Sequence, residues 1–518
     1  MNALRVAMIA VTLVLILGCK TGPDYKKPDV SVPGNWSEPL ANGEKPDSAQ
    51  LASWWKVFAD PLLESLVTRA VESNFDLKIA EARVREARAA LRVTDAGLWP
   101  QINVSGSYTR TQSQAISSAA AGAGSSTGTS GALTQGEPSA TIPSTGSSGE
   151  GSSTSTPKRQ NDLYQAGFDA SWELDVFGGT RREKEASKAD LEAAEENRKD
   201  TMVTLVAEVA RNYFGLRAVQ SRLEIAQRNI KIQQDSLDIT RARFQSGLTS
   251  ELDVKRAEAL LSSTQAPVPG LEAAAKQAVH RLGVLLGCAP GALQAELAAA
   301  VALPANPPEV PVGLPADLVV RRPDVRRAER QFAAATARIG VANADLYPKF
   351  SLTGSFSGVS TDFDGLRLDA NHIWAIGPSI RWPIFDGGRI RANIRIQNAR
   401  QEQALAAYEK AVMGSLEEVE NALVAYAKEQ NSLVYLGQAF DANQRALDMA
   451  NELYSKGLVD FLNVLDAERS LFAAEDLRTQ SKAAVLTNLV ALYKSLGGGW
   501  DYEACTQQEQ TAANGTAP

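Results

Sequence analysis

The chain has 518 residues, and its 53 Lys and Arg against 60 Asp and Glu give a formal net charge of −7. This acidic balance gives no reason to expect a nucleic-acid partner. The chain holds only two His, His280 and His372, and shows no Ser/His/Asp set, metal-ligand spacing or phosphate-binding loop. We therefore expect neither enzymatic activity nor a bound cofactor.

The N-terminus is typical of an exported protein. Residues 1–18 form an expected signal peptide, whose apolar run Val6–Leu17 is too short to span a bilayer. The run ends before Cys19 in a pattern that resembles a bacterial lipobox, so we expect diacylglycerol and palmitate on Cys19. An ordinary signal peptide with an unrelated cysteine is the alternative. In this class of lipoprotein, Lys20 after the cysteine favours the outer membrane.

Two further cysteines, Cys288 and Cys505, remain after Cys19. An oxidising periplasm would permit a disulfide between them, but sequence cannot place them within bonding distance. No other segment approaches about 18 consecutive apolar residues, so we expect no transmembrane helix in the mature chain.

The sequence repeats itself. Phe244–Leu261 matches Tyr454–Leu471 at one constant offset, and Leu98-Trp99-Pro100 recurs as Leu346-Tyr347-Pro348. A Ser/Gly/Thr-rich tract, Thr111–Pro157, lengthens the first copy and should form a solvated loop. We expect the following segments: an N-terminal segment 19–60, a first repeat 61–303, a linker 304–316, a second repeat 317–497 and a tail 498–518.

Four segments alternate apolar and polar residues, two in each repeat, and predict half-buried strands at about 98–110, 163–177, 346–358 and 373–385. Their apolar faces could pack on a protein core or face lipid, and runs of about 10 residues suit tilted transmembrane strands. Four strands cannot close a membrane barrel, so the lipid-facing interpretation requires oligomerisation. Two chains would give eight strands and three would give twelve, and the strands alone leave both open.

Two segments, at about 180–246 and 389–456, contain no Pro and predict helices of about 100 Å. Apolar residues recur in them at steps of seven, which indicates coiled-coil packing. The helices alone would also fit a plain structural rod. The repeating positions are Met202, Val209, Leu216, Leu223, Ile230, Leu237 and Phe244, and Val412, Val419, Tyr426, Leu433, Phe440, Leu447 and Tyr454.

Several motifs, added to this plan, resemble the TolC-like outer-membrane efflux proteins, in particular their OprM- and NodT-like lipoprotein branch. The resemblance spans nearly the whole chain outside the Ser/Gly tract and the last dozen residues. The motifs are Gly22-Pro23-Asp24-Tyr25, Trp54-Trp55-Lys56, Arg321-Arg322-Pro323-Asp324-Val325, Ala344-Asp345-Leu346-Tyr347-Pro348 and Leu496-Gly497-Gly498-Gly499-Trp500.

The resemblance implies an α+β membrane protein that is a homotrimer, with a twelve-stranded outer-membrane barrel continued by a helical tunnel in the periplasm. It also implies a passive exit duct for small molecules such as drugs, toxic organics or metal ions. The implied partners are a periplasmic adaptor (a membrane fusion protein), an inner-membrane RND-type transporter and outer-membrane lipid. An alternative with the same fold is the duct of a type I protein secretion system.

The resemblance also assigns the repeated turns. Gly247-Leu248 and Gly457-Leu458 would be the periplasmic tips that contact the adaptor. A Gly at the end of a helix lets the chain turn through a left-handed conformation. The alternative is that each Gly only terminates its helix.

A periplasmic gate is implied just past the second turn. Leu462, Asp466 and Arg469 match residues that narrow the resting channel in the OprM-like branch, whereas Asn463 stands where TolC has an acid. Three copies of Asp466 around an axis would repel one another and attract cations. Asp253 is the first-repeat counterpart of Asn463. A solvated Asp466–Arg469 pair on a helix face is the alternative.

Overall fold

The computed structural model describes residues 20–36, 51–113, 159–301, 303–304, 321–366 and 372–500, with side chains omitted at 112–113 and 159–161. The expected signal peptide, Cys19, residues 114–157 of the Ser/Gly tract, most of the linker, Cys505 and the tail beyond 500 lie outside these ranges. The chain divides into two units. The sheet unit comprises Leu98–Leu174 and Pro348–Trp382, and the helical unit comprises the remainder.

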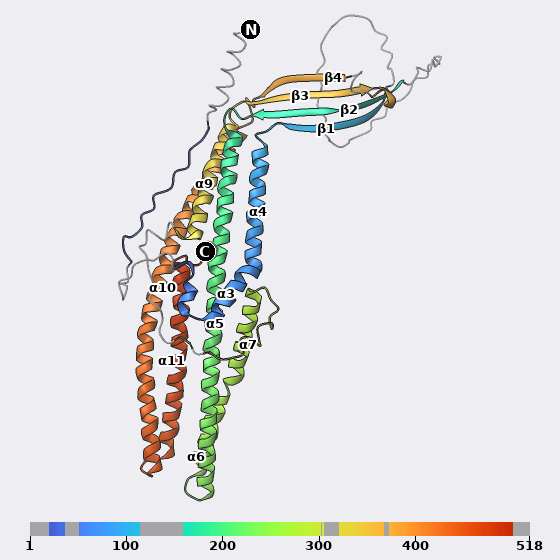
Figure 1. Cartoon of the computed structure of the whole chain (residues 1–518). Coiled ribbons are helices and arrows are strands. Elements are labelled where there is room, and N and C mark those ends of the chain that lie inside the picture. Colours follow the sequence, from blue (N-terminus) through green and yellow to red (C-terminus); the bar gives the residue numbers. More distant parts are fainter. Residues whose placement is uncertain are drawn as a thin grey trace, which may run out of the picture. The chain divides into compact units, whose positions relative to one another are not determined.

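The described chain is mostly helical, with one small sheet, as Figure 1 shows. The helical unit contains η1 (Trp54–Phe58), α3 (Pro61–Ser73), α4 (Phe75–Ala96), α5 (Gly179–Gln245), α6 (Glu251–Gln265), α7 (Val268–Leu285), α9 (Pro323–Ala344), α10 (Arg389–Ser455) and α11 (Phe461–Ser495). The sheet unit contains β1 (Gln101–Ser113), β2 (Arg159–Leu174), β3 (Lys349–Ser360), η2 (Phe363–Gly365) and β4 (His372–Arg381).

The two longest helices, α5 and α10, each contain 67 residues and are therefore about 100 Å long. Both begin in the same way. The Asp175 carboxylate accepts from the backbone N–H of Thr180 and Arg181, and the Asp386 carboxylate accepts from the N–H of Gly388 and Ile390. These acceptors satisfy donors that the first turn of a helix leaves unpaired. Among the described helices, none has the length and apolar character needed to cross a bilayer.

The residues at steps of seven lie on the packed side of each long helix. Met202, Val209, Leu216 and Leu237 are buried on α5, and the other members are half-buried except Phe244. On α10, Val412 and Val419 are buried and the rest of the series is half-buried. Phe244 is 42% exposed because α5 ends one residue later. The apolar period therefore marks the packed face of each long helix. On α5 this face joins the largest core and, toward the end of the helix, a cluster with α6 and α11, and on α10 Val412 packs against Val325 of α9.

The largest core of the helical unit joins segments that are far apart in sequence. The Trp54 ring stacks on Tyr493 with centroids 5.1 Å apart, and Phe58 contacts Phe214 at 4.8 Å. This core brings η1 and α3, near the start of the chain, together with α5, α7 and the end of α11. The aromatic cluster explains why the Trp54-Trp55 motif is nearly fully buried.

The sheet is antiparallel with strand order β1-β2-β3-β4. Residues opposite one another in neighbouring strands share a face, so the register identifies continuous rows of side chains. One row crosses all four strands and is apolar throughout, and each of its members is exposed in the single chain. That row is Val104, Phe168, Phe356 and Trp374.

The opposite face of the sheet is mostly polar. The Ser105 hydroxyl donates to Asp169 over 2.9 Å, and the hydroxyls of Ser351 and Ser379 are 2.7 Å apart. The sheet is thus two-faced, as the alternating sequence predicts. Its exposed apolar face has side chains suited to a nonpolar environment, and β1 and β4 are the outer strands of the sheet among the described residues.

Candidate functional site

The two turns that repeat in sequence also have the same local structure. At the end of α5, the N–H of Gly247 bonds to the carbonyl of Phe244, and the N–H of Leu248 bonds to that of Arg243. At the end of α10, Gly457 bonds to Tyr454 and Leu458 to Leu453 in the same pattern. Both are Schellman turns, which require a left-handed residue after the helix. Gly247 and Gly457 fill that position, with φ of +69° and +72°.

Both turns present an open surface. A Cβ added at Gly247 or Gly457 would meet no atom within 4 Å. The side chains of Leu248 and Leu458 are 75% and 68% exposed. The four residues expected to contact an adaptor are therefore accessible in the single chain. An exposed leucine beside a glycine provides an apolar contact that another helix can approach closely.

The helix after the first turn begins at a complete capping box. Ser250 accepts from the N–H of Asp253, and the Asp253 carboxylate accepts from the N–H of Ser250 and the hydroxyls of Ser250 and Thr249. The hydrogen bond from Thr249 holds the pKa of Asp253 below its usual value. Asp253 thus serves the start of α6, a role that the sequence comparison with Asn463 did not anticipate.

The helix after the second turn begins differently. Asn463 holds the position that Asp253 holds in α6, but its Nδ2 donates to the backbone carbonyl of Asp460 over 3.3 Å. Asp460 makes no side-chain cap. The two copies therefore share a turn but differ in how the following helix starts.

The expected gate residues lie together on α11. Leu462, Asn463, Asp466 and Arg469 are all exposed, at spacings that place them on one side of the helix. The other side is apolar and packs against α5, α6 and α10. The buried residues are Phe461, Val464 and Leu465 on α11, with Leu237, Val254, Ala257 and Leu261 facing them.

Asp466 and Arg469 form an ion pair within α11. The Arg469 Nη2 lies 2.6 Å from the Asp466 Oδ1, and the side chains are 70% and 62% exposed. An exposed pair three residues apart contributes little to stability. The pair is nonetheless a fixed positive and negative patch on the exposed face of α11.

Glu468, which the sequence analysis missed, lies on the other side of this helix. It follows Val464 and Leu465 by four and three residues, so it continues their buried face. Its Oε2 is buried without a hydrogen-bond partner, and burial raises the pKa of the carboxyl to about 7. The available sequence signal was a charged residue at an apolar position of the helix.

Further along α11, after Glu468, two ion pairs join this helix to α5. Arg222 donates through Nε and Nη2 to the two carboxylate oxygens of Asp476, over 2.6 and 3.1 Å. Arg228 pairs with Glu475. These contacts join segments that lie 254 and 247 residues apart in the sequence.

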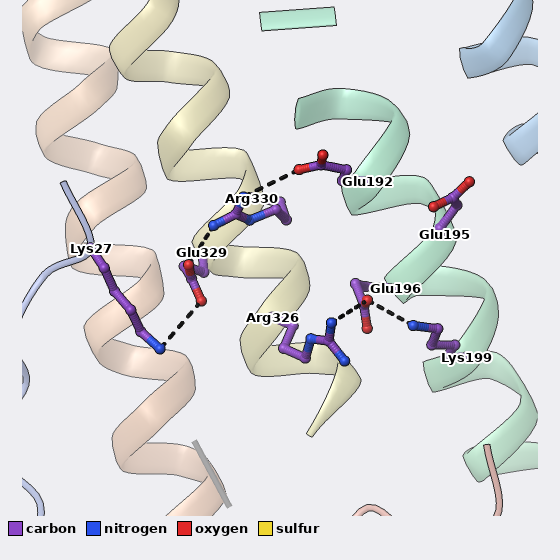
Figure 2. A pocket seen from close by; sticks show the side chains of 8 residues that line it. All are labelled: Lys27, Glu192, Glu195, Glu196, Lys199, Arg326, Glu329 and Arg330. Atoms are coloured by element: carbon purple, nitrogen blue, oxygen red, sulfur yellow. Dashed lines mark hydrogen bonds and ion pairs between the residues drawn. The ribbon is translucent and has the colours of Figure 1, made fainter. Parts of the chain in front are cut away.

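A pocket of about 630 Å³ lies on the helical unit between α5, α9 and the N-terminal segment (Figure 2). Arg326 and Arg330 from α9 reach Glu196 and Glu192 from α5 over 3.3 and 3.2 Å. All eight lining residues are charged, four acidic and four basic: Lys27, Glu192, Glu195, Glu196, Lys199, Arg326, Glu329 and Arg330. The acidic and basic side chains of the pocket neutralise one another's charge, and the ion pairs between them hold α9 against α5.

The described residues contain no group of three or more His, Cys, Asp or Glu arranged to hold a metal ion. Cys288, the described partner of the possible disulfide, is exposed with a free thiol, and Cys505 lies outside the described ranges.

Comparisons with known proteins agree with this arrangement. The family model described as outer membrane efflux protein matches residues 66–288 and 314–498. The chain is 32% identical over 504 residues to the cation efflux system protein CusC of Escherichia coli O6:H1, covering 96% of this chain and 100% of that protein. It is 31% identical over 499 residues to the solvent efflux pump outer membrane protein SrpC of Pseudomonas putida, covering 94% and 97%.

A solved structure of the outer-membrane channel OprN matches with a TM-score of 0.79 and 36% identity, covering 93% of this chain and 100% of that chain. The family match and the structural match each include most of the described elements. The chain therefore belongs to the outer membrane efflux protein family.

Proposed function

We propose that this chain is a homotrimeric outer-membrane exit duct of a tripartite efflux pump. The observation that carries the proposal is the apolar row across all four strands, exposed in a chain whose two longest helices each extend about 100 Å. Lipid would cover such a face. Helices of that length would carry the duct far from the bilayer.

The sheet edges support assembly from several copies. Unpaired backbone groups of β1 and β4 in hydrocarbon would cost several kcal/mol each. Pairing β1 of one copy with β4 of the next removes this cost, and three copies give a twelve-stranded barrel with room for a lumen. Similarity to an outer-membrane channel over 93% of the chain favours this assembly.

The exposed turns support docking of a periplasmic adaptor. Gly247 and Gly457 place Leu248 and Leu458 on an open surface, and a trimer would present six such turns. An adaptor helix hairpin could pack against each turn because the glycines carry no side chain. The adaptor would in turn connect the duct to an inner-membrane transporter of the RND type.

The exposed face of α11 supports a gate. In a trimer, three copies of Asp466 and Leu462 would approach the axis, and Arg469 would hold each Asp466 in place. A ring of carboxylates attracts cations and a ring of leucines excludes water. Because residue 463 is Asn and not an acid, α11 would contribute a single acidic ring to the gate, that of Asp466. Asp253, occupied in its capping box, is the weakest of the proposed gate residues.

The N-terminal pattern supports lipid anchoring. Acylation of Cys19 with diacylglycerol and palmitate would tether the chain to the outer membrane while the helices extend into the periplasm. The exported substrate is a small molecule in this proposal. Relatives are named for cation efflux and for solvent efflux, so both classes enter the test.

The test is complementation. A strain lacking its own outer-membrane ducts would receive this chain together with a matching adaptor and transporter from its source organism. Export of a metal cation, toluene and a fluorescent dye would be followed, and native mass spectrometry would give the oligomeric state. Restored export of any one substrate by a trimer supports the proposal. Secretion of a protein cargo without small-molecule export, or a monomer in lipid, would overturn it.

A further inference from the structure

The first residues after Cys19 are held against the helical unit by a buried arginine. Arg182, in the first turn of α5, is 1% exposed. Its Nε donates to the carbonyl of Thr21 over 3.0 Å, and its Nη2 donates to Gly22 and Asp24 over 3.3 and 2.7 Å. Three contacts from one guanidinium therefore reach three of four consecutive residues.

The same segment crosses α9 at close range. Gly22 has φ of +85°, and a Cβ there would lie 2.5 Å from the Cα of Gly340. A Cβ at Gly340 would lie 2.7 Å from the Thr21 carbonyl oxygen and 2.8 Å from the Arg182 Cγ. The crossing therefore requires glycine at both position 22 and position 340. The Thr21 hydroxyl completes it, with carbonyl oxygens of Phe177 and Gly340 at 3.1 and 3.2 Å.

A second contact follows one residue later. The Tyr25 hydroxyl donates to Glu329 over 2.8 Å, and its ring packs edge-on against Phe332 with centroids 5.9 Å apart. Arg330 lies over the same ring at 5.3 Å. The Gly22-Pro23-Asp24-Tyr25 motif is thus fixed at both ends, by Arg182 and by α9.

We propose that Arg182 and the Gly22–Gly340 crossing form a docking site for the N-terminal segment, which fixes the position of the lipid-bearing Cys19 independently of the lipid itself. This inference rests on the proposed lipid anchoring for its purpose. Thr21 is the second residue after Cys19, so the anchor is held within about 7 Å of the docked backbone. The docked backbone lies where the chain passes from β2 into α5, because Thr21 bonds to Phe177.

Docking at this place gives the membrane a defined level on the helical unit. The stacked pair Phe177 and Tyr347, with centroids 4.6 Å apart, adjoins the docked Thr21 through Phe177. Aromatic side chains of this kind prefer the boundary between lipid and water. A long flexible leader would instead let the acyl chains insert at any height within its reach.

The experiment measures docking directly. Trimers in detergent would be treated with trypsin, and mass spectrometry would quantify cleavage after Lys20 and Lys26. Arg182→Ala should raise the cleavage rate about tenfold, which corresponds to about 1.4 kcal/mol of lost docking. Arg181→Ala is the matched control, because the Arg181 side chain donates to the carboxylate and the backbone carbonyl of Asp175.

A second pair of variants leaves the helices unchanged. Gly22→Ala adds a Cβ that would clash with Gly340, whereas Gly34→Ala adds one with no atom within 4 Å. Gly22→Ala should therefore increase cleavage and Gly34→Ala should not. This pair decides the question if Arg182→Ala yields no trimers.

A Cys19→Ser variant, exported with a non-lipoprotein signal peptide so that it carries no acyl chains, separates the role of the lipid from that of the docking site. Its N-terminal segment should stay protected, and Arg182→Ala should release it in both forms. Protection that survives both Arg182→Ala and Gly22→Ala, or that Cys19→Ser alone removes, would overturn the docking site. An N-terminal peptide of the unmodified chain without acyl mass would instead contradict the proposed lipid anchor, so the two failures are distinct.

Discussion

Arg469 and Asp466 pair over 2.6 Å on the exposed face of α11, one helical turn apart. The opposite face of the same turn is buried against α5 and α6. The pair therefore faces away from its own chain. In the proposed trimer, Arg469 orients the ring of Asp466 carboxylates.

Breaking this pair should open the resting channel. We expect Asp466→Ala or Arg469→Ala to increase single-channel conductance in planar bilayers severalfold, because the proposed gate loses its charged pair. Lys255→Ala is the control, since it removes a similar exposed pair, with Glu258 at 3.0 Å, from α6. Conductance equal to that of the unmodified channel in both gate variants would exclude these residues from the gate.

Large side chains at the two turns should block export without dissociating the trimer. Trp at both Gly247 and Gly457 would occupy the open surface and strain a left-handed backbone, so adaptor binding and efflux should be lost. Asn at both positions tolerates that backbone and adds little bulk, and should retain most of the activity. Adaptor pull-down and dye accumulation measure the two effects. Normal efflux with both tryptophans would eliminate the turns as the docking site.

Glu468 should make stability depend on pH. Burial raises its pKa to about 7 from the usual 4.5, so the folded chain binds this proton more tightly than the unfolded chain. The neutral carboxyl contributes its full stability below about pH 4.5, and this contribution is lost as the pH rises through 7. Glu468→Gln should therefore melt at a higher temperature than the unmodified trimer at pH 8, and the difference should vanish near pH 4.5.

The control for this measurement is Glu452→Gln, which removes an exposed carboxylate on α10. Its melting temperature should differ from that of the unmodified trimer by the same small amount at both pH values. A Glu468→Gln variant that behaves like this control would mean that the carboxyl is solvated in the assembled protein.

Arg322 should be important for stability. It is 7% exposed and donates to Asp324, to Glu418 and to the backbone carbonyl of Ser495 over 2.7 to 3.0 Å. Its contacts join the start of α9 to α10 and the end of α11. Arg322→Ala leaves these acceptors without a buried donor, which costs about 3 kcal/mol.

Thermal unfolding with and without the substitution checks this cost. Arg326→Ala, one turn later on α9, removes a 3.3 Å contact from an arginine that is 38% exposed and should cost less than about 1 kcal/mol. Equal losses in the two variants would refute a special role for Arg322.

Much of the local structure follows from the sequence. The strands were expected at about 98–110 and 346–358, and β1 and β3 occupy Gln101–Ser113 and Lys349–Ser360. The long helices were expected at about 180–246 and 389–456 and occupy Gly179–Gln245 and Arg389–Ser455. These predictions succeed because the periods of two and of seven are local properties, repeated over enough residues to exclude other structures.

The roles of single charged residues were less accessible. The alignment with Asn463 predicts that Asp253 belongs to the gate, and the structure adds that the Asp253 carboxylate is held in a capping box. The sequence signal for this capping box is Ser250 followed three residues later by Asp253, just before an apolar run. Glu468 and Arg182 gave only weak signals, since a charged residue on a helix is usually solvated.

The sequence by itself determined the elements, their lengths and their apolar faces, because hydrophobic period, Gly and Pro act within a few residues. Only the tertiary structure decided which distant groups meet. Arg182 binds Thr21 across 161 residues of chain, and Arg222 binds Asp476 across 254. Such partners depend on how the helices pack, and a sequence records the charge of a residue but not the neighbour that the fold brings to it.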